Sequence, residues 1–322
     1  MKHCNKAILL FLFCLSYFTV FTQKRAAGLS FKVVPLGVKG GSDESNLSAY
    51  MLAAAGSNDY VCMDAGTVHY GIQKAISAGI FRGPVQTVLK NNIKGYLISH
   101  PHLDHVAGLI INSPDDTTKN IYALPFCTDV LKEKYFSWKS WANFADDGEK
   151  PLLNKYHYRV LAPGHEIPVA NTTLAVTAYE LSHSNPFKST AFLVRSGDAY
   201  LLYLGDTGAD SSEHANNLLL LWQRIAPLLK EKKLKALFIE VSFDNAQPEN
   251  LLFGHLTPAL LMREMNILSS LAGEAAMHQL PVIITHEKFG GIRESLIKKQ
   301  LFALNAVGVK LIFPVQAKQL SF

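Results

Sequence analysis

The chain has 322 residues, of which 31 are Lys or Arg and 26 are Asp or Glu, so its formal net charge is +5. Residues 1–27 contain four of the basic residues and none of the acidic ones, which leaves a net charge of +1 on residues 28–322. Such a nearly neutral chain lacks the basic footprint of a protein that binds long nucleic acids, and no nucleic-acid partner is expected. Residues 28–322 are sufficient for one large α/β domain.

The first 27 residues predict a secretory signal peptide. Lys2 and Lys6 begin the segment, an apolar run follows at 7–21, and polar residues return at 22–25. The apolar run is short for a membrane span, so no stable membrane insertion is expected after cleavage. The mature protein is then exported, to the periplasm or outside the cell. An uncleaved membrane anchor is the alternative.

Two cysteines remain after residue 27. Cys62 lies in the apolar run 60–63, and Cys127 follows another apolar run. In an oxidising compartment the two could form one disulfide. Their apolar surroundings favour two buried thiols instead.

Apolar runs separated by turn-forming residues predict a β-meander at the start of the domain, with strands at 31–36, 47–54 and 60–63. A helix at 70–77 then precedes a buried strand at 96–99. Beyond it we expect a strand at 121–124, a helix at 125–134 and a strand at 156–161. The Trp-rich segment 136–153 between them is irregular and could form a lid.

The second half of the domain repeats this pattern. Strands at 174–181, 190–195 and 200–204 predict a second meander, followed by a helix at 211–230. The remaining elements are expected at 236–241 (strand), 258–271 (helix, capped by Thr257), 281–285 (strand), 292–302 (helix) and 309–313 (strand). Two meanders, each followed by helices, predict an α/β sandwich of two sheets packed face to face with helices outside.

Three histidines and a carboxylate follow the strand at 96–99 within six residues. His100, His102 and Asp104 alternate along an extended segment and can point to one side, and the turn after Asp104 brings His105 beside them. Imidazole and carboxylate groups suit zinc or a similar cation, and pairs of such ions hydrolyse phosphoryl esters. We therefore predict a metal site here; a polar loop with scattered surface histidines is the alternative.

Three further candidate ligands end apolar strands. His183 follows the strand at 174–181, Asp206 follows the one at 200–204, and His286 follows the one at 281–285. Each alone could be an ordinary turn residue or a hydrogen-bonded strand end. Because α/β folds place their chemistry at the carboxyl ends of strands, we expect these side chains to complete the site.

Glu240 and His255 form a weaker candidate pair. Glu240 interrupts an apolar strand, so its carboxylate needs a partner. His255, just before the helix start at Thr257, could be that partner and donate a proton to a leaving alkoxide, with Glu240 orienting it. A structural hydrogen bond is the alternative.

The order His100-x-His102-x-Asp104-His105, then His183, Asp206 and His286, resembles the metallo-β-lactamase superfamily over nearly all of residues 28–322. The resemblance implies an αββα sandwich. It also implies one metal held by His100, His102, His183 and Asp206, and a second held by Asp104, His105, Asp206 and His286. The stretch 100–114, HPHLDHVAGLIINSP, is in addition similar to the signature of the class II 3′,5′-cyclic-nucleotide phosphodiesterases.

The resemblance implies hydrolysis of a small cyclic nucleotide, cAMP or cGMP, to a nucleoside 5′-monophosphate. A hydroxide that bridges two divalent ions would attack phosphorus, with zinc as the first choice of metal and Mn²⁺ or Fe²⁺ as alternatives. His255 or Asp104 would protonate the leaving 3′-oxygen.

Substrate contacts are expected from two regions of the sequence. Thr67 ends the turn at 64–67 and His69 follows it, so both are candidate contacts. The base is expected to stack on an aromatic wall of Trp138, Trp141 and Phe144, although a Trp-rich segment can equally be a hydrophobic cover.

Other functions remain open. Another hydrolase of the superfamily could act on RNA 3′ ends, lactones or other phosphodiesters. An exported protein that binds nucleotide or metal without turnover is a different class of function. Such a protein would be expected to have lost a metal ligand, and here every ligand position is present. The Asp-Thr-Gly at 206–208 could suggest an aspartic protease, which leaves the histidines unexplained. A homodimer is compatible with the sequence.

Overall fold

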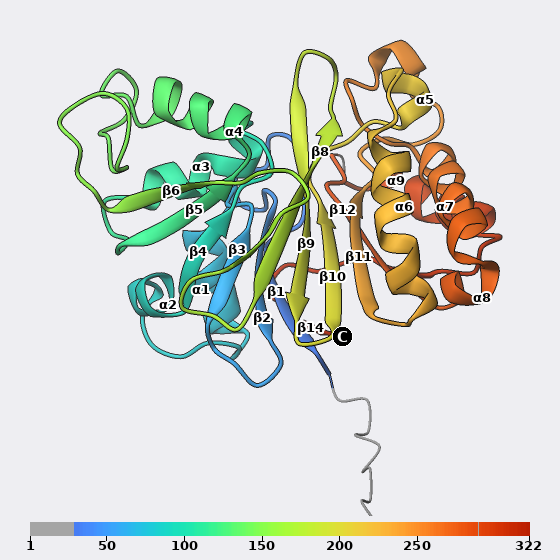
Figure 1. Ribbon diagram of the computed structural model, residues 1–322, viewed down its shortest axis with the longest axis horizontal. Helices are drawn as coiled ribbons and strands as arrows, with labels where there is room; N and C mark the ends of the chain where they lie inside the picture. Colours follow the sequence, from blue (N-terminus) through green and yellow to red (C-terminus); the bar gives the residue numbers. More distant parts are fainter. Residues whose placement is uncertain (1–28, 289) are drawn as a thin grey trace, which may run out of the picture.

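The computed structural model describes residues 29–288 and 290–322, and the predicted signal peptide lies outside them. Two seven-stranded sheets pack face to face, with helices on the outer face of each (Figure 1). This arrangement confirms the predicted αββα sandwich. Within the described ranges, every helix is too short or too polar to cross a membrane.

The first sheet has the strand order β14-β1-β2-β3-β4-β5-β6. Its strands are β1 (Phe31–Gly37), β2 (Ala49–Ala54), β3 (Tyr60–Met63), β4 (Ile93–Leu97), β5 (Lys119–Ala123), β6 (Tyr156–Val160) and β14 (Leu320–Ser321). The predicted meander β1 to β3 is antiparallel, whereas β3 to β6 are parallel. The helices of this half are α1 (His69–Ser77), α2 (Val85–Asn91), α3 (Leu103–Asn112) and α4 (Pro125–Val130), which a π-helical turn η1 (Leu131–Tyr135) continues.

The second sheet follows the same plan, in the order β13-β12-β11-β10-β9-β8-β7. Its strands are β7 (Glu166–Pro168), β8 (Ala175–Ser182), β9 (Lys188–Ser196), β10 (Ala199–Leu204), β11 (Leu234–Glu240), β12 (Pro281–Thr285) and β13 (Lys310–Ile312). Strands β7 to β10 are antiparallel and β10 to β13 parallel. The helical segments are α5 (Asp210–Glu213), α6 (Asn217–Lys230), η2 (Glu249–Leu251), α7 (Pro258–Ala272), α8 (Glu274–Met277) and α9 (Ile292–Leu304).

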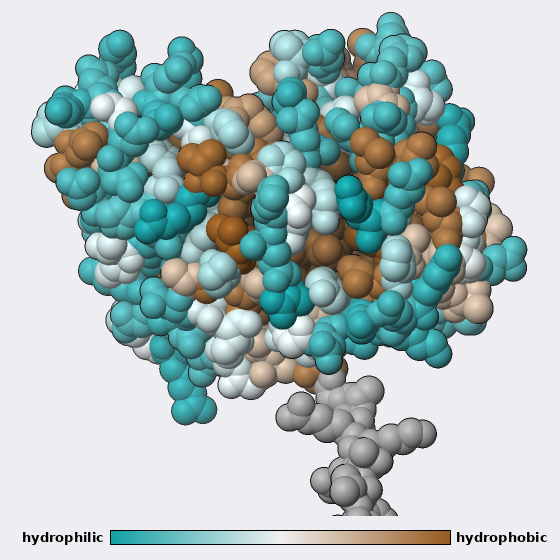
Figure 2. All heavy atoms as spheres, in the orientation of Figure 1, coloured by the Kyte–Doolittle hydropathy of each residue, from teal (hydrophilic) through white to brown (hydrophobic). Residues whose placement is uncertain are grey.

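The inner strands of each sheet are buried on both faces, which explains the long apolar runs in the sequence. In β2, Tyr50 packs into the layer between the sheets and Met51 into the layer under the helices; in β10, Leu201 and Leu202 divide in the same way. Figure 2 shows hydrophilic side chains over most of the visible face and hydrophobic ones gathered near its middle. Because the sheet faces are filled with apolar side chains, the polar residues that end the strands meet at the rim.

The predicted single helix at 211–230 is wrong at its start. Helix α5 ends at Glu213, the following His214 has a left-handed φ of +51°, and α6 begins at Asn217. The Asp210 carboxylate accepts hydrogen bonds from the backbone N–H groups of Leu218 (3.0 Å) and Leu219 (2.8 Å). These bonds satisfy free amides at the start of α6, so the break is stabilised by Asp210.

Five short elements are not among the predicted ones: the strands β7 and β14 and the helical segments α2, η2 and α8. The strand β14 has two residues and pairs with β1 across the chain, with Ser321 opposite Lys32. The prediction of two buried thiols is confirmed, because Cys62 and Cys127 are both free and buried.

Candidate metal centre

The seven predicted metal ligands converge at one rim of the sandwich, where strands of both sheets end. They are His100 and His102 after β4, Asp104 and His105 in the first turn of α3, His183 after β8, Asp206 after β10 and His286 after β12. Their donor atoms form two groups, and within each group all donor atoms lie within 4.8 Å of one another. The first group is His100, His102 and His183, and the second is Asp104, His105, Asp206 and His286.

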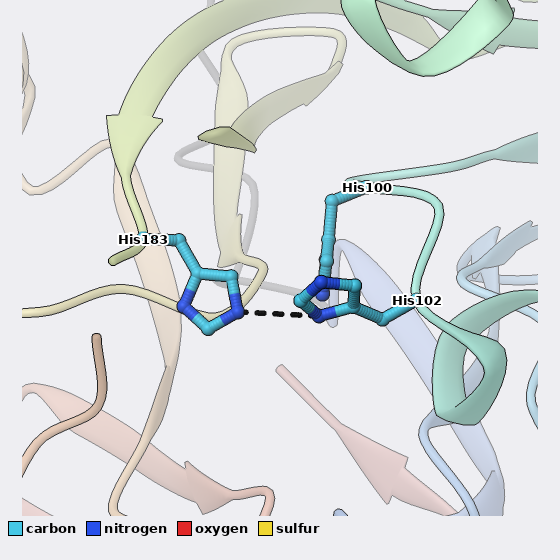
Figure 3. Close-up of side chains that lie close together, drawn as sticks. All are labelled: His100, His102 and His183. Atoms are coloured by element: carbon cyan, nitrogen blue, oxygen red, sulfur yellow. Dashed lines mark hydrogen bonds between the residues drawn. The ribbon is translucent and has the colours of Figure 1, made fainter. Parts of the chain in front are cut away.

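In the first group three imidazole rings approach one another (Figure 3). His183 comes from the end of β8, and the other two rings come from the loop that leads into α3. The Nε2 atom of His183 lies 3.3 Å from Nδ1 of His102. Two nitrogens bound to one tetrahedral zinc at about 2.0–2.1 Å would lie roughly 3.3 Å apart. The spacing therefore fits ligands of a shared cation.

Asp206 belongs to the second group and also faces the first. Its Oδ2 is 3.2 Å from His286 Nε2 in the second group and 3.7 Å from His100 Nε2 in the first. Its Oδ1 is 3.2 Å from His105 Nε2. The second group is completed by Asp104, whose Oδ2 is 3.1 Å from His286 Nε2. One carboxylate thus faces the donors of both groups.

Two of the imidazoles have a buried nitrogen that makes no hydrogen bond. The Nε2 atoms of His100 and His105 are buried and make no hydrogen bond to any described residue, although both face the Asp206 carboxylate, at 3.7 Å and 3.2 Å. Their Nδ1 atoms are engaged, with Ser99 Oγ at 3.0 Å and Asp64 Oδ2 at 2.8 Å respectively. A buried polar atom left unpaired costs about 1–3 kcal/mol and is rare. The two Nε2 atoms, beside a carboxylate, fit a site for a divalent metal.

The electrostatics favour the ligand forms of His100, His183 and Asp206. At His105, burial would lower the pKa, but the carboxylates of Asp206, Asp64 and Asp104 outweigh burial and hold this pKa well above its usual range. Burial, together with the charge of His105, holds the pKa of His100 well below its usual range, and burial lowers the pKa of His183 to about 4. Both imidazoles are therefore neutral at pH 7, the form that binds metal. Burial would raise the pKa of Asp206, but the charges of His286 and His105 outweigh it and hold this pKa well below the usual range.

Asp64 positions His105 and is not among the predicted site residues. Its carboxylate accepts hydrogen bonds from the Ser99 N–H (2.7 Å) and the Tyr203 hydroxyl (2.6 Å), and from His105 Nδ1. Such a carboxylate fixes the ring so that Nε2 is free to bind a metal. Asp64 directly follows β3, so the strand-end pattern that identifies the ligands could also have identified it.

The predicted pair Glu240 and His255 lies beside the second group. His255 Nδ1 donates to Glu240 Oε1 at 2.6 Å, and the His255 ring stacks on the His286 ring with centroids 5.3 Å apart. Ser242, which is not predicted, joins them: its hydroxyl donates to Glu240 Oε2 (2.6 Å) and lies 2.9 Å from His286 Nδ1. Glu240 therefore orients His255 directly and His286 through Ser242.

Two glycines let backbone approach the imidazoles. A Cβ on Gly40 would lie 2.1 Å from the His286 ring. Gly254 has a φ of +75°, its carbonyl accepts from His183 Nδ1 at 2.9 Å, and a Cβ there would lie 2.3 Å from the backbone nitrogen of Ser184. A side chain at either position would displace a candidate ligand.

Thr67 and His69, which are predicted substrate contacts, do not belong to the cluster of candidate ligands. The buried Thr67 hydroxyl accepts from the Leu47 N–H (2.8 Å) and donates to the Glu44 carbonyl (2.7 Å), so it secures the preceding loop. His69 is exposed at the first residue of α1.

Trp138 and Trp141 also lie away from the cluster. The Trp141 indole donates to Ser113 Oγ at 3.0 Å, and the backbone N–H of Trp138 donates to the Trp141 carbonyl. Ser113 caps the carboxyl end of α3, whereas the ligands lie at its amino end; a ten-residue helix separates the two by roughly 15 Å. Tyr135, directly before the Trp-rich segment, contacts the ligand loop, since its hydroxyl donates to the Pro101 carbonyl (2.9 Å). The Trp-rich segment therefore packs at the carboxyl end of α3, and its role as an aromatic wall or lid stays a prediction.

Comparison with known proteins places the sequence among named relatives. Residues 82–306 match the family model of "cAMP phosphodiesterases class-II". A 3′,5′-cyclic-nucleotide phosphodiesterase of Aliivibrio fischeri is 42% identical, with 99% of both chains covered. A probable 3′,5′-cyclic-nucleotide phosphodiesterase of Yersinia pestis is 36% identical over 95% of this chain and 92% of the relative.

Solved structures share the fold at lower identity. The unliganded yeast PDE1 crystal structure matches with a TM-score of 0.80 and 21% identity, covering 92% of this chain and 100% of that one. The metallo-β-lactamase fold protein YhfI of Bacillus subtilis matches with a TM-score of 0.61 and 15% identity, covering 91% and 99%. These likenesses establish the metallo-β-lactamase fold.

Proposed function

The chain belongs to the class II 3′,5′-cyclic-nucleotide phosphodiesterase family, and we propose on this premise that it hydrolyses cAMP, cGMP or both to nucleoside 5′-monophosphates. One observation of the structure carries the proposal: two groups of donors meet at the single carboxylate of Asp206, where the buried Nε2 atoms of His100 and His105 make no hydrogen bond. Paired cation sites of this kind suit the hydrolysis of a phosphodiester, which carries negative charge.

In this proposal each group binds one divalent ion. His100, His102, His183 and Asp206 hold the first, and Asp104, His105, Asp206 and His286 hold the second. Nitrogen and carboxylate donors make zinc the first choice, with Mn²⁺ or Fe²⁺ as alternatives. Bound there, the ions supply positive charge to the phosphate oxygens and a water activated for attack.

The reaction adds water at phosphorus and breaks the P–O3′ bond, so the 3′-oxygen needs a proton. His255 is placed to supply it: Nδ1 is held by Glu240, which stabilises the charged imidazole and leaves Nε2 to donate. Asp104 is the weaker candidate. Burial raises its pKa, but the charges of His105 and His286 outweigh burial and hold the pKa below the usual range of an Asp, so the carboxyl is a poor acid.

Purified protein is expected to convert cAMP and cGMP to 5′-AMP and 5′-GMP in a metal-dependent reaction. Removing metal with a chelator should abolish turnover, because the positive charge and the activated water are lost, and adding back Zn²⁺, Mn²⁺ or Fe²⁺ should restore it. Chromatography of the products, beside metal analysis of the same samples, measures both. Protein that carries two metal equivalents and leaves both nucleotides intact would contradict the substrate assignment.

We also infer that residues 1–27 direct export and are removed. The basic start, the apolar run and the polar return support this inference. Protein isolated from the producing cells is expected outside the cytoplasm with an amino terminus near residue 28, as determined by fractionation and intact mass. Protein retained in the cytoplasm at the full 35.5 kDa would contradict it.

A further inference from the structure

Three exposed apolar side chains lie close in the sequence to the candidate ligands and the candidate proton donor. Leu103 is 62% exposed, Phe187 57% and Phe253 60%, and each lies within four residues of a cluster histidine in the sequence. Single exposed apolar residues are ordinary, but several around one polar site mark a binding surface. Their position at the rim suggests contact with the part of the substrate that extends from the phosphate.

Phe187 is in direct contact with the cluster. Its ring packs against the His102 ring, with centroids 5.2 Å apart and planes inclined at 70°. His102 is partly buried, whereas His100 and His183 are fully buried, so solvent reaches the first group past His102. A substrate whose phosphate reaches this group extends its remaining atoms toward the same side, beside Phe187.

The backbone that carries Phe187 is held in place. The Phe187 N–H donates to the Ser184 carbonyl (3.1 Å), and the Ser184 N–H donates to Glu213 Oε2 (2.8 Å). Gly254 packs against the same Ser184 nitrogen, as its close approach shows. A ring positioned in advance loses little conformational freedom when a flat group binds against it.

We propose that Phe187 is the surface on which the base of the substrate stacks. The proposal rests on the proposed function, since it takes the substrate to be a cyclic nucleotide. An aromatic ring contacts the π-face of a base and not its hydrogen-bonding edges, so Phe187 favours purines without distinguishing adenine from guanine. The base wall then lies on the β8–β9 hairpin of the second sheet, and Trp138 and Trp141 are not part of it.

The test compares Phe187→Ala, Phe187→Leu and Phe187→Trp on cAMP, cGMP and a base-free analogue, methyl riboside 3′,5′-cyclic phosphate. Loss of stacking should raise KM for both nucleotides by about 10- to 100-fold in the Ala variant. Its kcat, its metal content and its kcat/KM for the base-free analogue should stay within about twofold of wild type, since the ligands are intact. Phe187→Trp should keep a low KM. Phe302→Ala is the matched control, because Phe302 is 63% exposed near the end of α9.

The Leu variant separates stacking from packing. Leucine keeps an apolar contact with His102 but offers no ring, so the proposal requires Phe187→Leu to resemble Phe187→Ala. Loss of metal, or an equal loss on the base-free analogue, would show that Phe187 only positions His102 and would overturn the proposal. An unchanged KM in both variants would also overturn it while leaving the proposed function intact. Wild-type protein inactive on every cyclic nucleotide would overturn both.

Discussion

Asp206→Asn is expected to lower kcat/KM for cAMP by more than about 10³-fold, the largest effect of any single substitution in the cluster. The carboxylate lies 3.2 Å from His105 and His286 and 3.7 Å from His100, so its charge serves both groups of donors. Asparagine has nearly the same size but no charge and only one oxygen. Both metals should therefore bind more weakly, which elemental analysis of dialysed protein would show beside the kinetics.

Two other Asp→Asn substitutions calibrate this result. Asp198→Asn changes an exposed turn between β9 and β10 and should leave activity and metal content unchanged. Asp64→Asn weakens the orientation of His105 without removing a ligand, so a loss of about 10- to 100-fold in metal affinity is expected. Thermal unfolding of all three variants checks the fold. If Asp206→Asn kept two metal equivalents and wild-type turnover, Asp206 would not be a ligand.

The candidate ligands could be predicted from the sequence because they share a local pattern. His183, Asp206 and His286 each follow an apolar run, and in parallel or adjoining strands such positions meet at one rim. The order of apolar runs likewise predicted both sheets, since strands buried on two faces leave a continuous apolar signal. In these cases a pattern of neighbouring residues is sufficient to predict which distant residues meet in the fold.

Other features depend on packing between distant segments and leave no local signal. Ser242 joins Glu240 to His286 only because β11 and β12 lie side by side. The sequence around Trp138 and Trp141 likewise gives no indication that they pack at the carboxyl end of α3. Phe187 also leaves no local signal. It is one exposed ring in a polar hairpin, and only the fold places it against His102.

The second large effect is expected at His255, and it depends on the leaving group. His255→Asn should lower kcat for cAMP by about 10²- to 10⁴-fold, because the 3′-oxygen then leaves without a proton. The variant should keep its metal content. A cAMP analogue with sulfur in place of the 3′-bridging oxygen releases a thiolate, whose conjugate acid has a pKa of about 8.5 and which needs no proton to leave. On this analogue the variant should approach wild-type kcat.

This comparison separates proton donation from metal binding. His255 Nδ1 lies 3.8 Å from Asp206 Oδ2, so the ring could instead belong to the donors of a cation. In that case His255→Asn would lose metal and would be slow on both substrates, as Asp206→Asn should be. Asp104→Asn provides the remaining contrast. If Asp104 is a metal ligand, the variant should be slow on cAMP and on the sulfur analogue; if Asp104 is the proton donor, the variant should be slow on cAMP alone. Because Glu240 holds Nδ1 of His255, Glu240→Gln should lower kcat for cAMP in the same direction as His255→Asn and be relieved by the same analogue.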